Sequence, residues 1–416
     1  MFPTPTTAVI VSVLAAVQAL GIADWGERLI AVGYLASQGA RINLSTPAED
    51  FRLEGLHAES FRDLVHLAPT EIELFRIRHP EVTLSRLPLF KNSLKRLILS
   101  FRESSPGSLR QLSELAHCEE LALTDVSIED SDFELICNRL HLKQLRVDAR
   151  LLSPTAILAL AKLQRLEVLQ LRDSRLTPAA TSAIAQCMKL KSLSILNGLA
   201  GDGDIVQLRS LRTLKTLSLS GTQVTDLSAE WIAKLPNLKG LNVSSTQMTT
   251  AGLAQFRALP QLEYLYAYQL KAAPKTNLNW AEWSIHLKSI MLTETRLGEG
   301  GLQGIGSLSN LDELLIEGTD VGENDVNQLK GLRRLSALHL NDTRLSDASL
   351  KEVLPSLSAL ATLYADGTEI SDESLEVLLR HPTLQSLSVR ETNITRPGGA
   401  KLMRHFGLGP NMWAPK

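Results

Sequence analysis

The sequence predicts an α/β solenoid: a horseshoe of stacked strand–helix units, with one parallel sheet on its concave face and helices on its convex face. Three observations predict it. The pattern L-x-x-L-x-L returns about every 24 residues, and a stretch with helical spacing follows each copy. The composition is rich in leucine, whereas aromatic residues make up only 5% of the 416 residues. Such a unit cannot bury its own apolar side, so the units must stack on one another.

Fifteen copies of the pattern span residues 48–407. Clear copies are LKRLIL at Leu94 and LKTLSL at Leu214, and weaker ones begin at Ile72 and Ala48. Eleven of the fourteen intervals between copies are 24 residues long, two are 25 and one is 22. Each copy predicts one strand, whose leucines point into the core while the alternate side chains point outward.

The segment after each strand predicts a capped helix. Copies such as GTQVTD (221–226) and GTEISD (367–372) place Ser or Thr before Asp, and leucines at helical spacing follow. Ser and Thr are favoured N-caps, and Asp in the first turn suits the helix dipole. Proline then ends several of the helices, as at Pro236, Pro260 and Pro382.

These units resemble the leucine-rich-repeat superfamily, and the variety is similar to the Thr/Asp-rich 24-residue repeats of bacterial proteins and, more loosely, to the cysteine-containing repeats of F-box proteins. The resemblance implies a protein that binds a partner. One departure is that the ninth repeat position holds Thr where many members hold Asn. Because a hydroxyl donates and accepts, we expect these threonines to form a ladder between adjoining turns. They are Thr222, Thr246, Thr295, Thr319, Thr343, Thr368 and Thr392.

Two end segments flank the repeats. Residues 1–47 predict an N-terminal hydrophobic helix and a capping segment that includes an edge strand at 41–44, and residues 408–416 predict a C-terminal tail. The apolar run at residues 6–23 has two interpretations: a helix packed on the first repeat, or a membrane anchor or export signal, although no basic residue precedes it. Bacterial proteins with similar repeats often carry such a segment, which slightly favours a membrane-anchored or exported protein over a cytoplasmic one.

The sequence predicts no enzyme, no cofactor and no metal site. HExxH, GxSxG and P-loop patterns do not occur, and the glycine-rich run at 298–306 lacks the spacing of a dinucleotide-binding loop. Cys118, Cys137 and Cys187 fall where the repeat needs apolar side chains, so we expect buried thiols. A formal net charge of −2 gives no support to nucleic-acid binding.

The fifth repeat position predicts a binding surface, because it points outward from every strand. Over five consecutive strands this column is mostly apolar, and acidic residues flank it at positions seven and eight, whereas the N-terminal strands carry Arg76, Arg78, Lys95, Arg96, Arg146 and Arg172. The column reads Tyr266, Met291, Leu315, His339 and Tyr364. We expect a partner to contact Tyr264, Tyr266, Tyr268, Met291, Leu315, Tyr364, Glu294 and Glu317. The alternative is that these side chains only strengthen cross-strand pairing.

The sequence therefore predicts a scaffold that binds another protein, with a glycan as the other candidate ligand and a membrane contact only through residues 6–23. One alternative is the substrate-recognition subunit of a ubiquitin-ligase-type complex, although the first 47 residues do not resemble an F-box. Another is an envelope-displayed receptor for a glycan or protein.

Residues 269–286 depart from the repeat, and there Trp280 and Trp283 either fill a gap or mark a contact on the convex edge.

Overall fold

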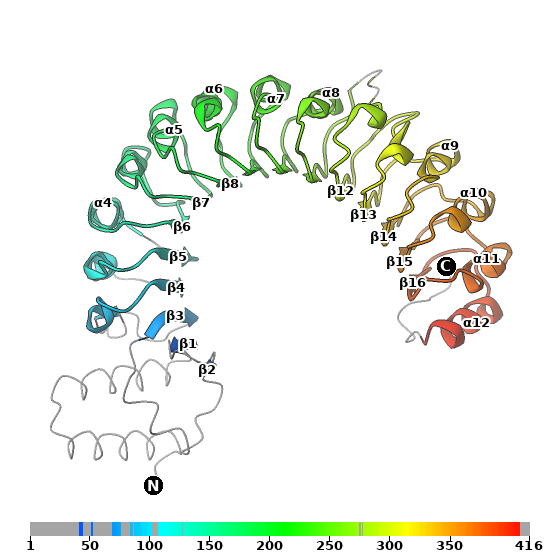
Figure 1. The fold of residues 1–416 in the computed structure, drawn as a ribbon, viewed down its shortest axis with the longest axis horizontal. Helices are drawn as coiled ribbons and strands as arrows, with labels where there is room; N and C mark the ends of the chain where they lie inside the picture. Colours follow the sequence, from blue (N-terminus) through cyan, green and yellow to red (C-terminus); the bar gives the residue numbers. More distant parts are fainter. Residues whose placement is uncertain are drawn as a thin grey trace, which may run out of the picture. The chain divides into compact units, whose positions relative to one another are not determined.

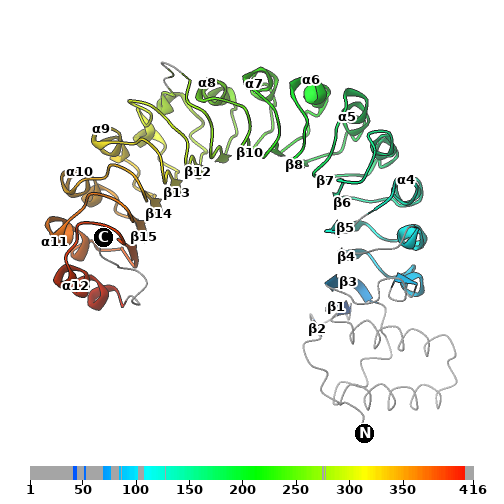
Figure 2. The same cartoon turned by 180° about the vertical axis from the view of Figure 1, so that it is seen from behind.

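The computed structural model describes residues 41–44, 51–52, 69–75, 84–85, 87–101, 107–126, 128–273, 276 and 278–407. The chain divides into two compact units, Met1–Gly198 and Leu199–Lys416. In each unit the strands line one side and the helices the other, as Figure 1 shows and Figure 2 shows from behind. The apolar run at 6–23 and the tail at 408–416 lie outside the described residues.

The strands of the first unit follow the chain order from β3 onward and are parallel there. Their bounds are β1 Arg41–Leu44, β2 Phe51–Arg52, β3 Pro69–Phe75, β4 Arg96–Ser100, β5 Glu120–Thr124, β6 Gln144–Asp148, β7 Val168–Arg172 and β8 Ser192–Leu196. The edge strand predicted at 41–44 is confirmed as β1, which pairs antiparallel with β3. The repeat copy at Ala48 adds no parallel strand, since β2 pairs antiparallel with β1. The parallel stack therefore begins at β3.

Short helices of the first unit connect these strands, and among the described ones three are 3-10 helices and two are α-helices. They are η3 Leu87–Phe90, η4 Ser108–Glu114, α4 Asp130–Arg139, η5 Ala156–Lys162 and α5 Pro178–Ala185. Each packs on its neighbours along the row, so every repeat covers the apolar side of the next.

The second unit holds eight parallel strands in one constant register. They are β9 Thr216–Ser218, β10 Gly240–Asn242, β11 Tyr264–Tyr266, β12 Ser289–Met291, β13 Glu313–Leu315, β14 Ala337–His339, β15 Thr362–Tyr364 and β16 Ser386–Ser388. Leu265 pairs with Ile290, although the interval between these repeats is 25 residues. Since the register does not shift, the extra residue lies outside the strands.

The helices of the second unit are also short, and several change from α to 3-10 geometry before they end. They are α6 Asp202–Ile205, η6 Val206–Ser210, α7 Asp226–Ile232, α8 Thr250–Gln255, η7 Phe256–Ala258, η8 Trp280–Glu282, η9 Ile305–Ser307, α9 Glu323–Val326, η10 Asn327–Leu329, α10 Asp347–Val353, η11 Leu354–Ser356, η12 Asp372–Ser374, α11 Leu375–Leu379 and α12 Arg396–Phe406.

The first, fourth and sixth positions of each repeat fill the core, as the pattern predicts. In the repeat of β11 these are Leu262, Leu265 and Ala267, and none of the three is exposed to solvent. Cys118 occupies the first of these positions, whereas Cys137 on α4 and Cys187 just after α5 lie on the helix side, and all three are buried. The prediction of buried thiols is confirmed.

The eighth repeat position turns the chain away from the strand in a left-handed conformation. Glycine occupies it at Gly318, with φ of 62°, but Glu294 and Asp342 adopt the same conformation with φ of 57° and 54°. Side chains with a Cβ seldom adopt positive φ, and Asp, Asn and Gly tolerate it best. The acidic residues at this position therefore serve the turn as well as the surface.

The predicted threonine ladder is mostly wrong. In six of the seven turns the Thr hydroxyl donates to the carbonyl three residues earlier in its own repeat, as Thr368 does to Ala365 at 2.7 Å. Only Thr295 joins two repeats, since its hydroxyl donates to the Ala267 carbonyl at 2.8 Å and accepts from the Leu270 amide at 3.1 Å. A short side chain reaches its own turn more easily than the next one.

The Ser or Thr before Asp caps the helix, as predicted. The Ser346 hydroxyl, for example, accepts from the Ser349 amide at the start of α10. The aspartate has a second role that the pattern did not predict, because it reaches the cap of the following repeat. The Asp226 carboxylate accepts from the amide and the hydroxyl of Thr249, both at 2.7 Å. These contacts connect successive helices.

Trp280 and Trp283 fill the gap left by the irregular repeat. Their side chains are 0% and 3% exposed, and their ring centroids lie 4.6 Å apart. The Trp280 indole donates to the Gly301 carbonyl and the Trp283 indole to the Leu278 carbonyl, both at 2.8 Å. The first of the two interpretations is therefore confirmed, and the pair is not a surface contact.

Candidate functional site

The fifth-position column exists as predicted, because the strands hold its members side by side. Tyr266 pairs with Met291, Met291 with Leu315, Leu315 with His339, and His339 with Tyr364. All five side chains are half-buried rather than fully exposed. Each covers part of its neighbour while its remaining surface faces solvent. We call these five residues the apolar column.

Polar and ring contacts hold the last two side chains of the apolar column, His339 and Tyr364, in place. The rings of His339 and Tyr364 lie 4.5 Å apart between centroids. The Glu317 carboxylate lies 3.1 Å from Nδ1 of His339 and accepts from the Asn341 side chain at 2.8 Å. A side chain already held in place loses less conformational entropy when a partner binds.

Tyr264 lies on the same face as Tyr266, since side chains two residues apart share a face of a strand, whereas Tyr268 lies in the turn beyond the end of β11. Tyr264 is 38% exposed, and Tyr268 is half-buried. Gly240 is the β10 residue paired with Tyr264, so no side chain stands beside the tyrosine in that direction. The strand therefore carries two of the three predicted tyrosines, and Tyr264 is the more exposed of them.

The flanking acids lie at the turn beyond the strands, where most of them have partners. Glu294 accepts from the Gln269 side chain at 2.7 Å. Asp366 forms an ion pair with Arg390 at 2.7 Å. The acidic flank is thus bound into the turns and is less available to a partner than the sequence suggested.

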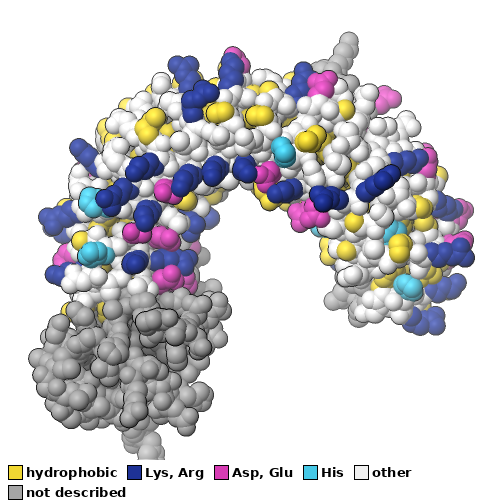
Figure 3. Space-filling view, viewed as in Figure 1, with side chains coloured by type: hydrophobic (Ala, Val, Ile, Leu, Met, Phe, Trp, Pro, Cys, Tyr) yellow, Lys and Arg dark blue, Asp and Glu magenta, His cyan; other side chains and the backbone are white. Residues whose placement is uncertain are grey.

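The basic residues of the first unit are also partly neutralised. Arg96 lies within 3.5 Å of Glu71 and 3.4 Å of Glu120. Arg76 and Arg78 lie outside the described residues. In Figure 3 Lys and Arg side chains are interleaved with Asp and Glu side chains near the strands, so the basic character predicted for this end is weaker than its arginine count implies.

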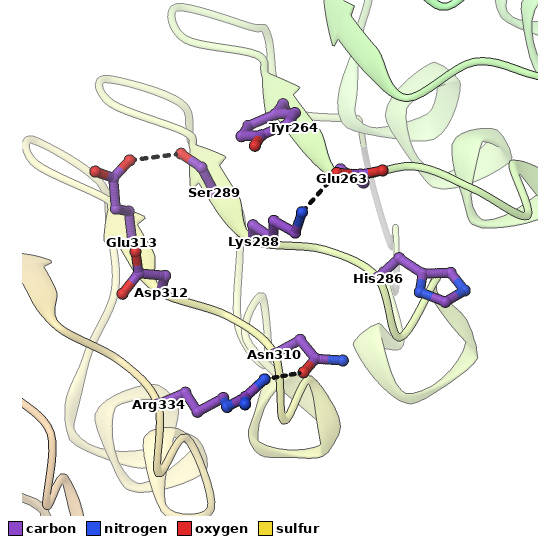
Figure 4. A pocket seen from close by; sticks show the side chains of 9 residues that line it. All are labelled: Glu263, Tyr264, His286, Lys288, Ser289, Asn310, Asp312, Glu313 and Arg334. Carbon is purple, nitrogen blue, oxygen red and sulfur yellow. Dashed lines mark hydrogen bonds and ion pairs between the residues drawn. The ribbon is translucent and has the colours of Figure 1, made fainter.

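A pocket of about 710 Å³ lies beside the apolar column and was not predicted. It opens at the ends where strands β11, β12 and β13 begin, and Figure 4 shows the side chains around it. The lining residues are Glu263, Tyr264, His286, Lys288, Ser289, Asn310, Asp312, Glu313 and Arg334. They occupy the second and third repeat positions and the loops before them, and Tyr264 is the one lining residue among the side chains predicted to contact a partner.

A three-membered ion pair forms one side of this pocket. Glu263 accepts from Lys239 at 2.6 Å and from Lys288 at 2.8 Å. The hydrogen bonds from Lys239 and Lys288 lower the pKa of the Glu263 carboxyl to about 2. This group therefore stays ionised throughout the physiological pH range.

The cysteine thiols are buried and resist ionisation. Burial raises the pKa of the Cys118 thiol to about 12 and that of Cys187 to about 11, and it raises the pKa of Cys137 as well. Such thiols are not reactive thiolates at neutral pH. Within the described ranges, no three His, Cys, Asp or Glu side chains gather in a way that could hold a metal ion. None of the described helices is long and apolar enough to cross a membrane.

Comparison with known proteins agrees with the repeat architecture. A family model described as a leucine-rich repeat region matches residues 96–354. No curated protein matches the chain. Among solved structures, an internalin from Listeria monocytogenes is similar with 22% identity and a TM-score of 0.56, over 76% of this chain and 89% of the internalin. A leucine-rich-repeat protein from Leptospira interrogans matches with 16% identity and a TM-score of 0.45, over 80% of this chain and 91% of that one. At these identities the likeness is one of fold.

Proposed function

Because the chain belongs to the leucine-rich-repeat family, we propose that it is a binding scaffold that holds a protein partner on the strand face of its second unit. The contact residues proposed for this face are the eight named from the sequence: Tyr264, Tyr266, Tyr268, Met291, Leu315, Tyr364, Glu294 and Glu317.

The observation that carries this proposal is the apolar column itself. Five large or ring-bearing side chains, from Tyr266 to Tyr364, stand in register on five adjacent strands and remain partly exposed. A contiguous apolar surface on a soluble fold is typical of interaction sites, and Tyr and Met are enriched in them. Cross-strand pairing alone does not require such large residues, since the fifth position of β9 and β10 holds Ser218 and Asn242.

The proposal is tested by removing the apolar surface without disturbing the core. We would immobilise the full chain and a Tyr266→Ser/Met291→Ser/Leu315→Ser variant, and compare the proteins each captures from an extract of the cells that make it. We expect the variant to lose a partner that the wild-type chain captures. Truncating well-placed interface side chains costs roughly 1–4 kcal/mol each, which suffices to abolish capture.

The control removes exposed apolar side chains elsewhere in the same unit. Leu199 and Leu227 are 68% and 74% exposed and lie away from the strand face. A Leu199→Ser/Leu227→Ser variant should capture the partner as the wild-type chain does. If the column variant has the wild-type unfolding midpoint and still captures the same proteins in equal amounts, the proposed function is wrong.

A further inference from the structure

The shape of the pocket follows from the sizes of three side chains in one row. The third repeat position holds Tyr264 on β11, Ser289 on β12 and Glu313 on β13, and these residues pair directly across the sheet. Neighbouring strands lie about 4.8 Å apart, so the two large residues stand about 10 Å apart with the small serine between them. Ser289 is 3% exposed and forms the floor. The hollow can therefore receive one side chain.

The charges around the hollow are unequally paired. Lys288 is directed to Glu263, and Figure 4 shows its amine turned toward that carboxylate and away from Asp312. Glu313 accepts only a neutral hydrogen bond, from Ser289 at 3.0 Å. Among the residues that the structure describes, neither Asp312 nor Glu313 has an ion-pair partner. Two carboxylates thus line one side of the pocket without a cation.

The remaining cation of the pocket does not neutralise them. Arg334 donates to the Asn310 side chain at 2.7 Å, and Figure 4 shows both residues at the opposite end of the pocket from Tyr264. Glu263 is already shared between Lys239 and Lys288, so Asp312 and Glu313 are the carboxylates of the lining that have no ion-pair partner among the described residues.

We propose that this pocket receives a basic side chain, arginine or lysine, of the protein partner. This inference rests on the proposed function, because it presupposes that the partner is a protein. Asp312 and Glu313 accept the charged hydrogen bonds, and Tyr264 supplies an aromatic face. Hydrogen bonds between a guanidinium or ammonium and a carboxylate are among the strongest in proteins, and cations are attracted to aromatic rings.

The structure already contains one contact between a cation and the Tyr264 ring. The Lys288 ammonium lies 6.0 Å from the centroid of the Tyr264 ring. An anionic ligand would meet the unpaired carboxylates, and a neutral sugar would leave their charge uncompensated. A cation is therefore the ligand that matches the charge of the lining.

The pocket is continuous with the apolar column. Tyr264 lines the pocket, and Tyr266 begins the column two residues later on the same strand face. A partner that occupies both must present a basic side chain next to an apolar stretch. This combination gives a criterion for recognising a partner among captured proteins.

The inference is tested with a small probe that measures the pocket alone. Nα-acetyl-arginine methylamide is titrated into the full chain and followed by saturation-transfer NMR, with the citrulline analogue as an uncharged probe of almost the same shape. We expect arginine to bind and citrulline not to bind. In an Asp312→Asn/Glu313→Gln variant both carboxylates are neutralised, and we expect the Kd for arginine to rise at least tenfold, since the loss of even one charged hydrogen bond has about that effect.

A matched variant removes two carboxylates from the helix side. Glu230 and Glu376 have side chains 75% and 72% exposed, and each faces a cation one helical turn away. A Glu230→Gln/Glu376→Gln variant should bind arginine as the wild-type chain does. Equal binding of citrulline and arginine, unchanged affinity in the Asp312/Glu313 variant, or binding of N-acetylglucosamine in place of arginine would each overturn the inference.

The two proposals fail in different ways. If the column variant loses its partner but the arginine probe does not bind, only the pocket inference is wrong. If the probe binds as expected but the column variant keeps its partner, the column is wrong and the pocket keeps its basic ligand.

Discussion

The Asp347 carboxylate accepts hydrogen bonds from both the amide of Ser371, at 2.9 Å, and its hydroxyl, at 2.7 Å. Ser371 caps the helix of the next repeat, so one aspartate at the start of α10 fixes where the following helix begins. The hydroxyl of Ser374 donates to the same carboxylate. The helices are therefore joined in sequence order by their caps, just as the strands are joined by their ladders.

Removing this carboxylate should destabilise the second unit. In Asp347→Ala the Ser371 amide and hydroxyl lose their acceptor, and we expect the free energy of unfolding to fall by about 1–3 kcal/mol. Chemical denaturation of the full chain measures the loss. An exposed aspartate that has no such contact and no positive φ offers the control, and Asp312→Ala should cost less. An equal loss for both variants would show that the contact with the next cap adds no stability.

The aspartates of this type should also make stability depend on pH. Burial opposes ionisation of Asp347, but the hydrogen bonds from Ser371 and Ser374 outweigh it and lower the pKa of the carboxyl. The pKa of Asp202 is lowered in the same way, against burial, by Ser228 and Thr225.

A lowered folded-state pKa contributes stability above the unfolded value of about 3.9, and that stability is lost as pH falls through the folded value. We therefore expect the contribution of these aspartates to the free energy of unfolding to stay level above about pH 5 and to fall below about pH 4. Denaturation curves recorded across this range should show a shallower fall for Asp347→Asn. A steeper fall in that variant would contradict the role given to the carboxylate.

Two threonines at the same repeat position should respond differently to one substitution. Thr368→Val removes a single hydrogen bond within one turn, and we expect a loss of about 1 kcal/mol. Thr295→Val removes two bonds that join adjacent repeats and leaves the Leu270 amide without its acceptor, so its cost should be at least twice as large. Thermal or chemical unfolding of the two variants decides this, and a larger loss for Thr368→Val would refute it.

Two buried tryptophans provide a comparable pair. Trp280→Phe leaves the Gly301 carbonyl without its donor, whereas the Trp231 indole nitrogen has no hydrogen-bond partner among the residues that the structure describes. Both substitutions remove a similar ring volume from the core, so the difference between them reports the hydrogen bond. We expect Trp280→Phe to destabilise the chain by about 1–2 kcal/mol more than Trp231→Phe, measured by denaturant unfolding.

Most of the repeat architecture could be predicted from the sequence, because it depends on short-range spacing. Leucines that recur every 24 residues specify a strand, and strict alternation then places Tyr266, Met291 and Leu315 on one face. The cap residues before α7 and α10 could be predicted equally well, since Ser or Thr before Asp is a common helix N-cap. These features need no knowledge of side-chain conformation.

The features that the sequence did not reveal depend on which of two neighbours a side chain forms its ion pair or hydrogen bond with. Lys288 can reach acids on either side, and the pocket is open because it pairs with Glu263 and not with Asp312. The Thr hydroxyls could have bonded within a turn or across turns, and geometry selects the nearer carbonyl. β2 pairs antiparallel with β1 because the chain between Leu44 and Phe51 is too short for the crossover that a parallel pair needs. A row reading Tyr264, Ser289 and Glu313 was the available signal for the pocket, but it lies outside the fifth position.

The strand register stays constant through repeats of 24 and 25 residues. A change in length on the helix side of a unit therefore does not shift the residues on its strand side. Residues gained or lost on the helix side leave the order of the strand residues unchanged. Loops there can lengthen or shorten over evolutionary time while a partner meets the same succession of side chains. The helix side of the chain can thus change in sequence and length while the strand side keeps its surface.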